Sequence, residues 1–223
     1  MAGFGYSLFS LPLLLFVMEP ASAVPMLSVT SILLNVMVFA EARRSFSLKR
    51  VLPLMVSGVV AIPLGIHLLK TANPSLMKAV TGILVSVSAA AYLKGFRVRV
   101  KREKAVMVPV GIASGILNGA TTLSGPPVIL FLSNQKVPKR PFRASLAAYF
   151  LLLNLVAAPA FFAQGLLTRE VAVNILYLFP AVAAGSILGI KLANRVSEDV
   201  FRRFSLAALC LLGLVSAASA MGG

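Results

Sequence analysis

The chain has 223 residues, of which 59% are hydrophobic and 12% charged, and its formal net charge is +15. Soluble globular domains carry about 25% charged residues, so this composition excludes a soluble enzyme or a nucleic-acid-binding module despite a pI near 11.0. A helix needs about 20 apolar residues to cross a bilayer. The chain divides into uncharged runs that approach or exceed that length, which predicts an all-α polytopic membrane protein. These runs are 1–18, 20–40, 51–69, 79–93, 105–135, 144–168, 171–190 and 204–223.

The positions of the basic residues predict the orientation of these segments. Eighteen of the 21 Lys and Arg residues lie in four short regions of the chain: 43–50, 94–104, 136–143 and 191–203. Short basic loops stay on the cytoplasmic side of a membrane. We therefore expect all four loops to be cytoplasmic and the protein to lie in the plasma (inner) membrane.

The fifth run, 105–135, cannot be one simple span, because the loops on both sides of it are strongly basic. Its middle reads GATTLSGPP (119–127), and Gly, Thr and paired Pro are poor helix formers. We therefore expect a re-entrant segment, whose halves 105–118 and 124–135 enter from the cytoplasm and return to it. Non-helical backbone at membrane depth is tolerated only inside protein or along a cavity, so this break is a candidate site.

The two halves of the chain resemble each other. Combined with the predicted orientation, this similarity indicates two inverted-topology repeats of about four segments each, an architecture of secondary transporters that places the substrate at the interface of the repeats. We expect a first repeat at 1–93, a basic linker at 94–104 and a second repeat at 105–223. Residues 1–10 leave no room for a counterpart of 105–118, so either the true start lies upstream or one half-helix is missing. The matching stretches are 12–16 with 127–131, 32–35 with 151–154, and 64–68 with 188–192, at offsets that grow from 115 to 124.

The candidate site residues are neutral and polar, because no Asp, Glu, Lys or Arg lies within a predicted membrane core. Ser124-Gly125-Pro126-Pro127 is typical of a helix start, and a helix N-terminus at membrane depth suits an anion; a simple kink is the alternative. Asn35 and Asn154 occupy equivalent repeat positions, where they could contact substrate or join helices. The expected substrate-binding set is Ser124, Gly125, Pro126, Pro127, Asn154, Asn35, Thr121, Thr122, Asn118 and, as the weaker first-half counterpart, Ser10.

Other residues are expected to serve packing rather than chemistry. Gly111, Gly115 and Gly119 form a doubled GxxxG pattern, which favours close helix contact. His67 and Cys210 are the single histidine and cysteine, so we predict no metal site, no cofactor and no catalytic role. An intramembrane enzyme would lack an acid, a base or a metal cluster.

On these motifs the sequence resembles the TauE/SafE sulfite exporter family, over nearly its whole length. The resemblance rests on GIASGILNGATTLSGPPVILF (111–131), FRASLAAYFLLLN (142–154) and FPAVAAGSILGIKLANRVSEDVFRRF (179–204), and on the regions around Asn35 and 53–65. It implies a two-halved transporter of sulfite, sulfonates or related anions. A missing first half-helix would depart from the family pattern.

We therefore expect a secondary transporter that exports a small anion by alternating access, with the lipid bilayer and the anion as its partners. A monoanion leaving a cell at −100 mV gains about 2.3 kcal/mol, so efflux needs no coupling ion. The alternative is a structural or assembly membrane protein that transports nothing. The sequence indicates no nucleic-acid partner and gives no specific sign of a homo-oligomer.

Overall fold

The computed structural model describes residues 4–93, 103–135 and 138–193, and this part of the chain is entirely helical apart from short connections. The predicted eighth run, 204–223, and most of the linker at 94–104 lie outside the described residues. The helices are α1 (Phe4–Leu14), α2 (Pro20–Ala42), η1 (Arg43–Ser45), α3 (Leu48–Thr71), α4 (Pro74–Leu93), α5 (Glu103–Thr121), α6 (Gly125–Asn134), α7 (Lys139–Ala163) and α8 (Arg169–Ala193).

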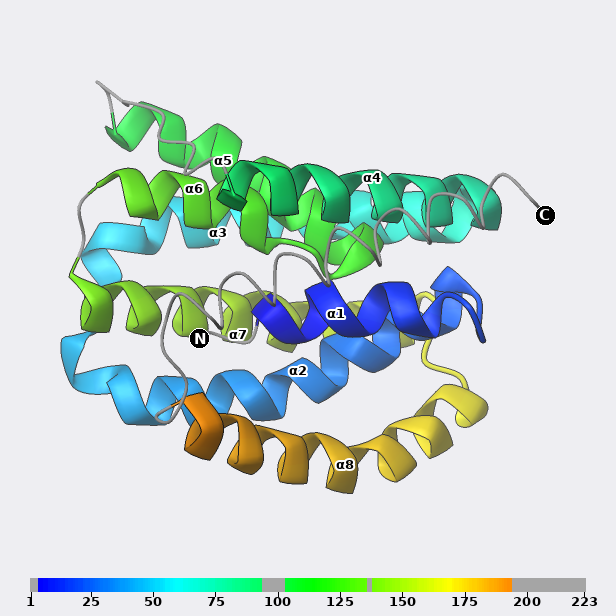
Figure 1. Cartoon of the computed structure of the whole chain (residues 1–223). Helices are drawn as coiled ribbons and strands as arrows, with labels where there is room; N and C mark the ends of the chain where they lie inside the picture. Colours follow the sequence, from blue (N-terminus) through cyan, green and yellow to red (C-terminus); the bar gives the residue numbers. More distant parts are fainter. Residues whose placement is uncertain (1–3, 94–102, 136–137, 194–223) are drawn as a thin grey trace.

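The helices lie side by side as a bundle whose axes run in roughly the same direction (Figure 1). Among the described residues, four helices are long and apolar enough to cross a membrane, and α1 and α5 contain shorter apolar stretches. The predicted all-α polytopic class is confirmed. The four spans are Pro20–Ser45, Val51–Thr71, Pro74–Ala91 and Arg140–Ala163.

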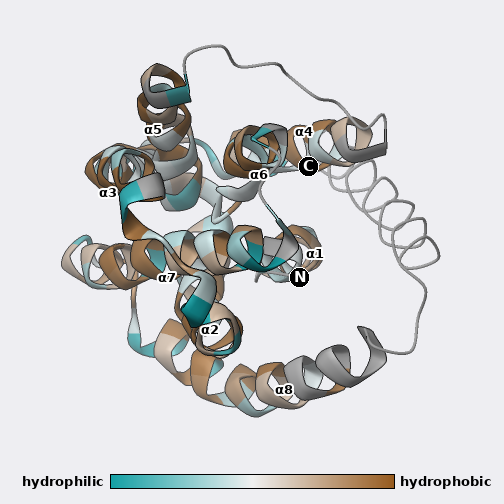
Figure 2. Cartoon of the chain, turned by 90° about the vertical axis from the view of Figure 1, so that its left-hand side faces the viewer, coloured by the Kyte–Doolittle hydropathy of each residue, from teal (hydrophilic) through white to brown (hydrophobic). Residues whose placement is uncertain are grey.

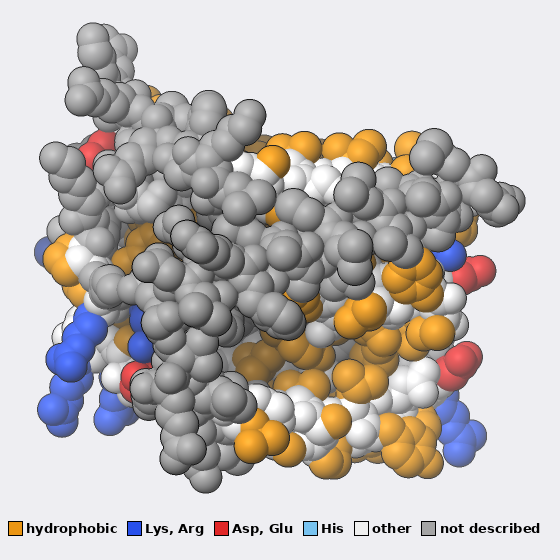
Figure 3. Space-filling view, viewed as in Figure 1, with side chains coloured by type: hydrophobic (Ala, Val, Ile, Leu, Met, Phe, Trp, Pro, Cys, Tyr) orange, Lys and Arg blue, Asp and Glu red, His pale blue; other side chains and the backbone are white. Residues whose placement is uncertain are grey.

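The surface has the distribution of side chains that a bilayer requires. In Figure 3, charged side chains gather towards the two ends of the bundle and hydrophobic ones lie between them. Large apolar side chains are exposed on α3 and α8, whose ribbons are largely in the hydrophobic colour in Figure 2. In water such faces would be unusual, whereas against lipid they are the expected surface. They include Leu52, Val56, Val60 and Leu64 on α3 and Leu176, Tyr177 and Leu188 on α8.

Among the described helices, α3 and α5 share the most extensive contact, and glycines on both helices allow it. A Cβ added at Gly115 would overlap the carbonyl oxygen of Gly58, and one added at Gly111 would lie 2.6 Å from the carbonyl oxygen of Leu54. A Cβ added at Gly119, one turn further along, would lie 2.5 Å from the carbonyl oxygen of Ile62 on α3. The predicted packing role of the doubled GxxxG pattern is confirmed. We call this contact the glycine seam.

The predicted break in the fifth run is also confirmed. Helix α5 ends at Thr121 and α6 begins at Gly125, so the uncoiled stretch is 122–124. Thr122 has φ of 58°, a left-handed conformation that strains a β-branched residue. The start of α5 and the end of α6 lie at the same end of the bundle (Figure 1), as a re-entrant segment requires.

Helix directions agree with the predicted inversion of the two halves. Helices α1 and α6 both begin near the middle of the bundle and run to opposite ends, and α2 and α7 are antiparallel (Figure 1). The counterpart of α4 would fall after residue 193, outside the described residues. The inverted repeat and its domain boundaries therefore stay a prediction.

Candidate functional site

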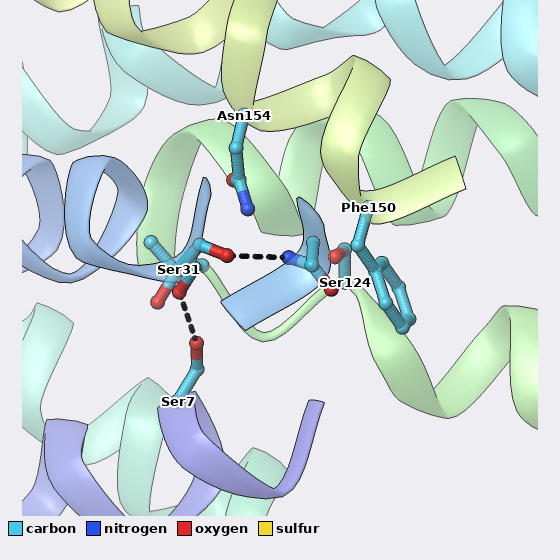
Figure 4. Close-up of a pocket in the computed structure, with 7 residues that line it drawn as sticks. Ser7, Ser31, Ser124, Phe150 and Asn154 are labelled. Carbon is cyan, nitrogen blue, oxygen red and sulfur yellow. Dashed lines mark hydrogen bonds between the residues drawn. The ribbon is translucent and has the colours of Figure 1, made fainter. Parts of the chain in front are cut away.

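A small polar pocket lies where α1, α2, α7 and the break before α6 converge (Figure 4). About 10 Å³ of it can hold the centre of a water molecule, which is close to the minimum for one water. A sulfite-sized ion would require the pocket to widen. The lining side chains are Ser7, Ser31, Asn35, Thr122, Ser124, Phe150 and Asn154.

The Asn154 amide is held by two neighbouring helices. Its Oδ1 accepts hydrogen bonds from Ser28 Oγ of α2 at 3.1 Å and from Asn118 Nδ2 of α5 at 3.2 Å. A carbonyl oxygen has two lone pairs, so both are occupied and the orientation of the amide is fixed. In Figure 4 the Asn154 amide nitrogen points into the pocket. Asn154 thus presents a donor to whatever the pocket holds.

Ser124 supplies a second donor from the break. Its Oγ accepts a hydrogen bond from Asn118 Nδ2 at 3.4 Å, which leaves its hydroxyl hydrogen available. Ser114 Oγ of α5 donates to the Ser124 carbonyl at 2.7 Å and anchors the uncoiled backbone. Asn118 and Ser114 therefore position both donors without lining the pocket themselves.

The opposite wall comes from α1 and α2. Asn35 Nδ2 donates to the Ser31 carbonyl at 2.9 Å, and Ser31 Oγ donates to the Leu27 carbonyl at 2.6 Å. Ser7 Oγ lies 3.5 Å from Ser31 Oγ; since the Ser31 hydrogen is already used, Ser7 is the donor of this long contact. Asn35 Oδ1 is buried and has no hydrogen-bond partner in the described part of the chain.

The start of α6 adds a weak positive field to this site. The N-terminus of a helix carries roughly half a positive charge, and α6 begins beside the pocket at Gly125. Ser124 holds the N-cap position but makes no capping bond with its side chain. Pro126 and Pro127 carry no N–H, so the first turn offers fewer backbone donors than an ordinary helix start. Side chains must supply most hydrogen bonds to an anion.

The pocket lining has no ionisable side chain, and no group of three or more His, Cys, Asp or Glu that could hold a metal occurs in the described residues. The nearest charges on α2 and α7 are Glu41 and Arg143, which form an ion pair with a 3.1 Å separation between Oε2 and Nη2. Both side chains are partly exposed at the end of the bundle. The site is therefore a set of neutral dipoles.

Sequence reasoning found part of this site. The structure brings Asn35, Asn154, Thr122 and Ser124 to the pocket. Of the other expected residues, Asn118 lies directly behind the lining. Thr121 stabilises the break, because its Oγ1 accepts a hydrogen bond from the Leu123 N–H at 3.2 Å. Gly125, Pro126 and Pro127 form the first turn of α6.

The expected role of Ser10 is wrong in one respect. The sequence predicts that Ser10 begins the first-half counterpart of α6. In the structure Ser10 lies well inside α1, which runs from Phe4 to Leu14. Pro12 follows within the same helix, because a membrane helix tolerates proline where its surroundings satisfy the freed backbone groups. Ser7, one turn earlier, lines the pocket instead.

Three lining residues were not expected: Ser7, Ser31 and Phe150. The repeat offsets contain the missing signal. Thr122 lies 115 positions after Ser7, while Phe150 and Asn154 each lie 119 positions after Ser31 and Asn35. Six of the seven lining residues thus form three pairs at the offsets that the sequence comparison gave. Applying the offset to Thr122 would have identified Ser7.

A family model described as sulfite exporter TauE/SafE matches residues 1–216. No curated protein and no solved structure gave a significant match to this chain.

Proposed function

Because the chain belongs to the TauE/SafE sulfite exporter family, a family of membrane transporters, we propose that it exports sulfite or a closely related small oxyanion through the pocket between α1, α2, α6 and α7. The protein is a multi-pass membrane protein. In the proposed orientation, the basic loops face the cytoplasm of a cell whose plasma membrane it spans.

The pocket's donors carry this proposal. Asn154 Nδ2 and the Ser124 hydroxyl converge on one polar cavity inside an apolar bundle, beside the start of α6. Burying hydrogen-bonding groups in an apolar medium is unfavourable unless they find partners. An oxyanion offers several acceptor oxygens, so it is a suitable partner for these groups.

Alternating access supplies the route across the membrane. The pocket has walls from both halves of the chain and space for about one water, so an ion must enter by a movement of one half against the other. Such rocking is the usual mechanism of inverted-repeat transporters. Export follows from the membrane potential, since an anion leaves a negatively charged interior downhill.

Purified protein in liposomes tests the proposal. Vesicles loaded with sulfite should release it faster than protein-free vesicles, and a potential negative inside should increase the rate. Ser124→Ala should lower the rate about tenfold or more, because a donor to an ionised ligand contributes about 1.5–3 kcal/mol. Ser133→Ala is the matched control, since Ser133 is an exposed serine on the same helix.

Two results would contradict the proposal. Wild-type protein that releases none of sulfite, sulfonates or thiosulfate would favour a structural or assembly role. Equal rates in the Ser124 and Ser133 variants would show that the ion does not pass the pocket.

A further inference from the structure

The pocket contains an acceptor that an ordinary anion cannot satisfy. Asn35 is 1% exposed, and its Oδ1 has no partner among the described residues. The orientation of the amide is determined, because the Ser31 carbonyl can only accept and the nitrogen must therefore face it. A buried acceptor without a donor costs about 1–3 kcal/mol, so the bound ligand is the natural source of a hydrogen.

Two polar groups of the pocket have hydrogens to offer a ligand, because the hydroxyl hydrogens of Ser7, Ser31 and Thr122 already bond within the protein. Asn154 Nδ2 and the Ser124 hydroxyl donate from the α7 and α6 side, whereas Asn35 Oδ1 accepts from the α2 side. A ligand that fits both sides needs oxygen acceptors at one end and an O–H at the other. A fully ionised oxyanion has only acceptors and would leave Asn35 unpaired.

The charge of the pocket leads to the same requirement. Among the described residues, the lining has no cation, and the desolvation penalty of an ion rises steeply with its charge. Neutral dipoles and the roughly half positive charge at the N-terminus of α6 stabilise a monoanion much better than a dianion.

Resting on the proposed function, we infer that the transported species is a small monoanion that keeps a hydroxyl hydrogen, such as hydrogen sulfite, and that Asn35 Oδ1 accepts this hydrogen. Asn154 and Ser124 donate to the ionised end of the same molecule. The sulfite dianion, into which hydrogen sulfite ionises near neutral pH, is excluded from the site.

Protein groups at the pocket do not titrate near neutral pH, the range in which hydrogen sulfite ionises. The described lining contains no Tyr, His, Cys, Lys, Arg, Asp or Glu side chain. The charged side chains of the described helices lie at helix ends, away from the lining. Those with described side chains are Glu19, Glu41, Arg43 and Arg44 around α2, Lys49 and Lys70 on α3, Lys78 on α4, Glu103 on α5, Arg140 and Arg143 on α7, and Arg169 and Glu170 on α8.

The first test needs no variant. Sulfite efflux from proteoliposomes is measured across neutral pH at constant total sulfite, with the leak from protein-free vesicles subtracted. The rate should follow the hydrogen sulfite fraction and fall about tenfold per pH unit above the pKa of the ion. A rate that follows total sulfite overturns the inference but leaves the transport function intact.

The second test removes the acceptor. Asn35→Leu preserves approximate volume and should lower hydrogen sulfite transport about tenfold, the loss expected for one hydrogen bond to an ionised ligand. Methanesulfonate is a monoanion without the hydrogen. It should inhibit hydrogen sulfite transport by the wild-type protein and by the variant with equal affinity. Asn174→Leu on α8, outside the pocket, should change neither.

The outcomes separate the two proposals. If Asn35→Leu weakens the binding of hydrogen sulfite and of methanesulfonate equally, Asn35 does not recognise the hydrogen. The inference then fails, while the proposed function stands. If the wild-type protein transports none of these ions, both the inference and the proposed function fail.

Discussion

The glycine seam and the pocket are supported by adjacent faces of α5 and solve different problems. At the seam, Gly111, Gly115 and Gly119 let two backbones come into contact, with only the small side chains of Ser57 and Ala61 beside them. At the pocket, Ser114 and Asn118 of the same helix donate hydrogen bonds to Ser124 and Asn154, which line the cavity. One helix thus joins a rigid contact to an adaptable one, and the tests below distinguish the two.

The largest effect is expected at the seam. In Gly115→Ala the new methyl group would overlap the Gly58 carbonyl oxygen, and backbone cannot yield as a flexible side chain does. We expect a loss of about 1–3 kcal/mol in stability, measured as a lower unfolding temperature in detergent. Gly185→Ala is the control, because an added Cβ there meets no atom within 4 Å in the described part of the chain. Equal unfolding temperatures would show that the helices are not in close contact.

Substitution of a residue that supports the pocket should change stability less than a substitution at the seam, but it should clearly lower the transport rate. Asn118→Leu removes one donor from Asn154 Oδ1 and the donor to Ser124 Oγ. Hydrogen bonds between membrane helices contribute about 0.6 kcal/mol on average, so the unfolding temperature should change little. The transport rate should fall severalfold, because the Asn154 amide loses half of its restraint.

Ser28→Ala tests the same point from α2, since it removes the second donor to Asn154 Oδ1. It should lower transport in the same direction as Asn118→Leu. Full transport in both variants would mean that the orientation of Asn154 does not matter.

The smallest effect is expected at the end of the bundle. Arg143 and Glu41 join α7 to α2 through an ion pair whose side chains are 36% and 57% exposed. Exposed pairs contribute about 0–1 kcal/mol and are screened by salt. Arg143→Gln should therefore lower the unfolding temperature slightly at low salt and not at high salt. A large loss at both salt concentrations would indicate a role beyond the pair.

Much of this architecture could be predicted because the bilayer imposes strong rules on sequence. Charges marked the helix ends, and the GATTLSGPP stretch marked the break within about three residues of its position. Asn35 and Asn154 stood out because an amide is unusual in an apolar run. These signals depend on local composition and need no knowledge of packing.

The remaining site residues depend on three-dimensional packing. Ser31 and Ser7 are ordinary in membrane helices, where a hydroxyl can bond to its own backbone, as Ser31 does to Leu27. Phe150 is one apolar residue among many. Nothing in the local sequence distinguishes them, and Ser10 misled because a Ser-x-Pro stretch also occurs inside a helix.

The absence of a fixed charge from the pocket lining bears on speed rather than on recognition. A site for a travelling ion must bind well enough to admit it and weakly enough to let it leave. A buried lysine or arginine beside Asn154 would hold the ion in a deep free-energy well and slow its exit. Hydroxyls and amides give a shallow free-energy well, which suits the proposed export by frequent, brief occupancy.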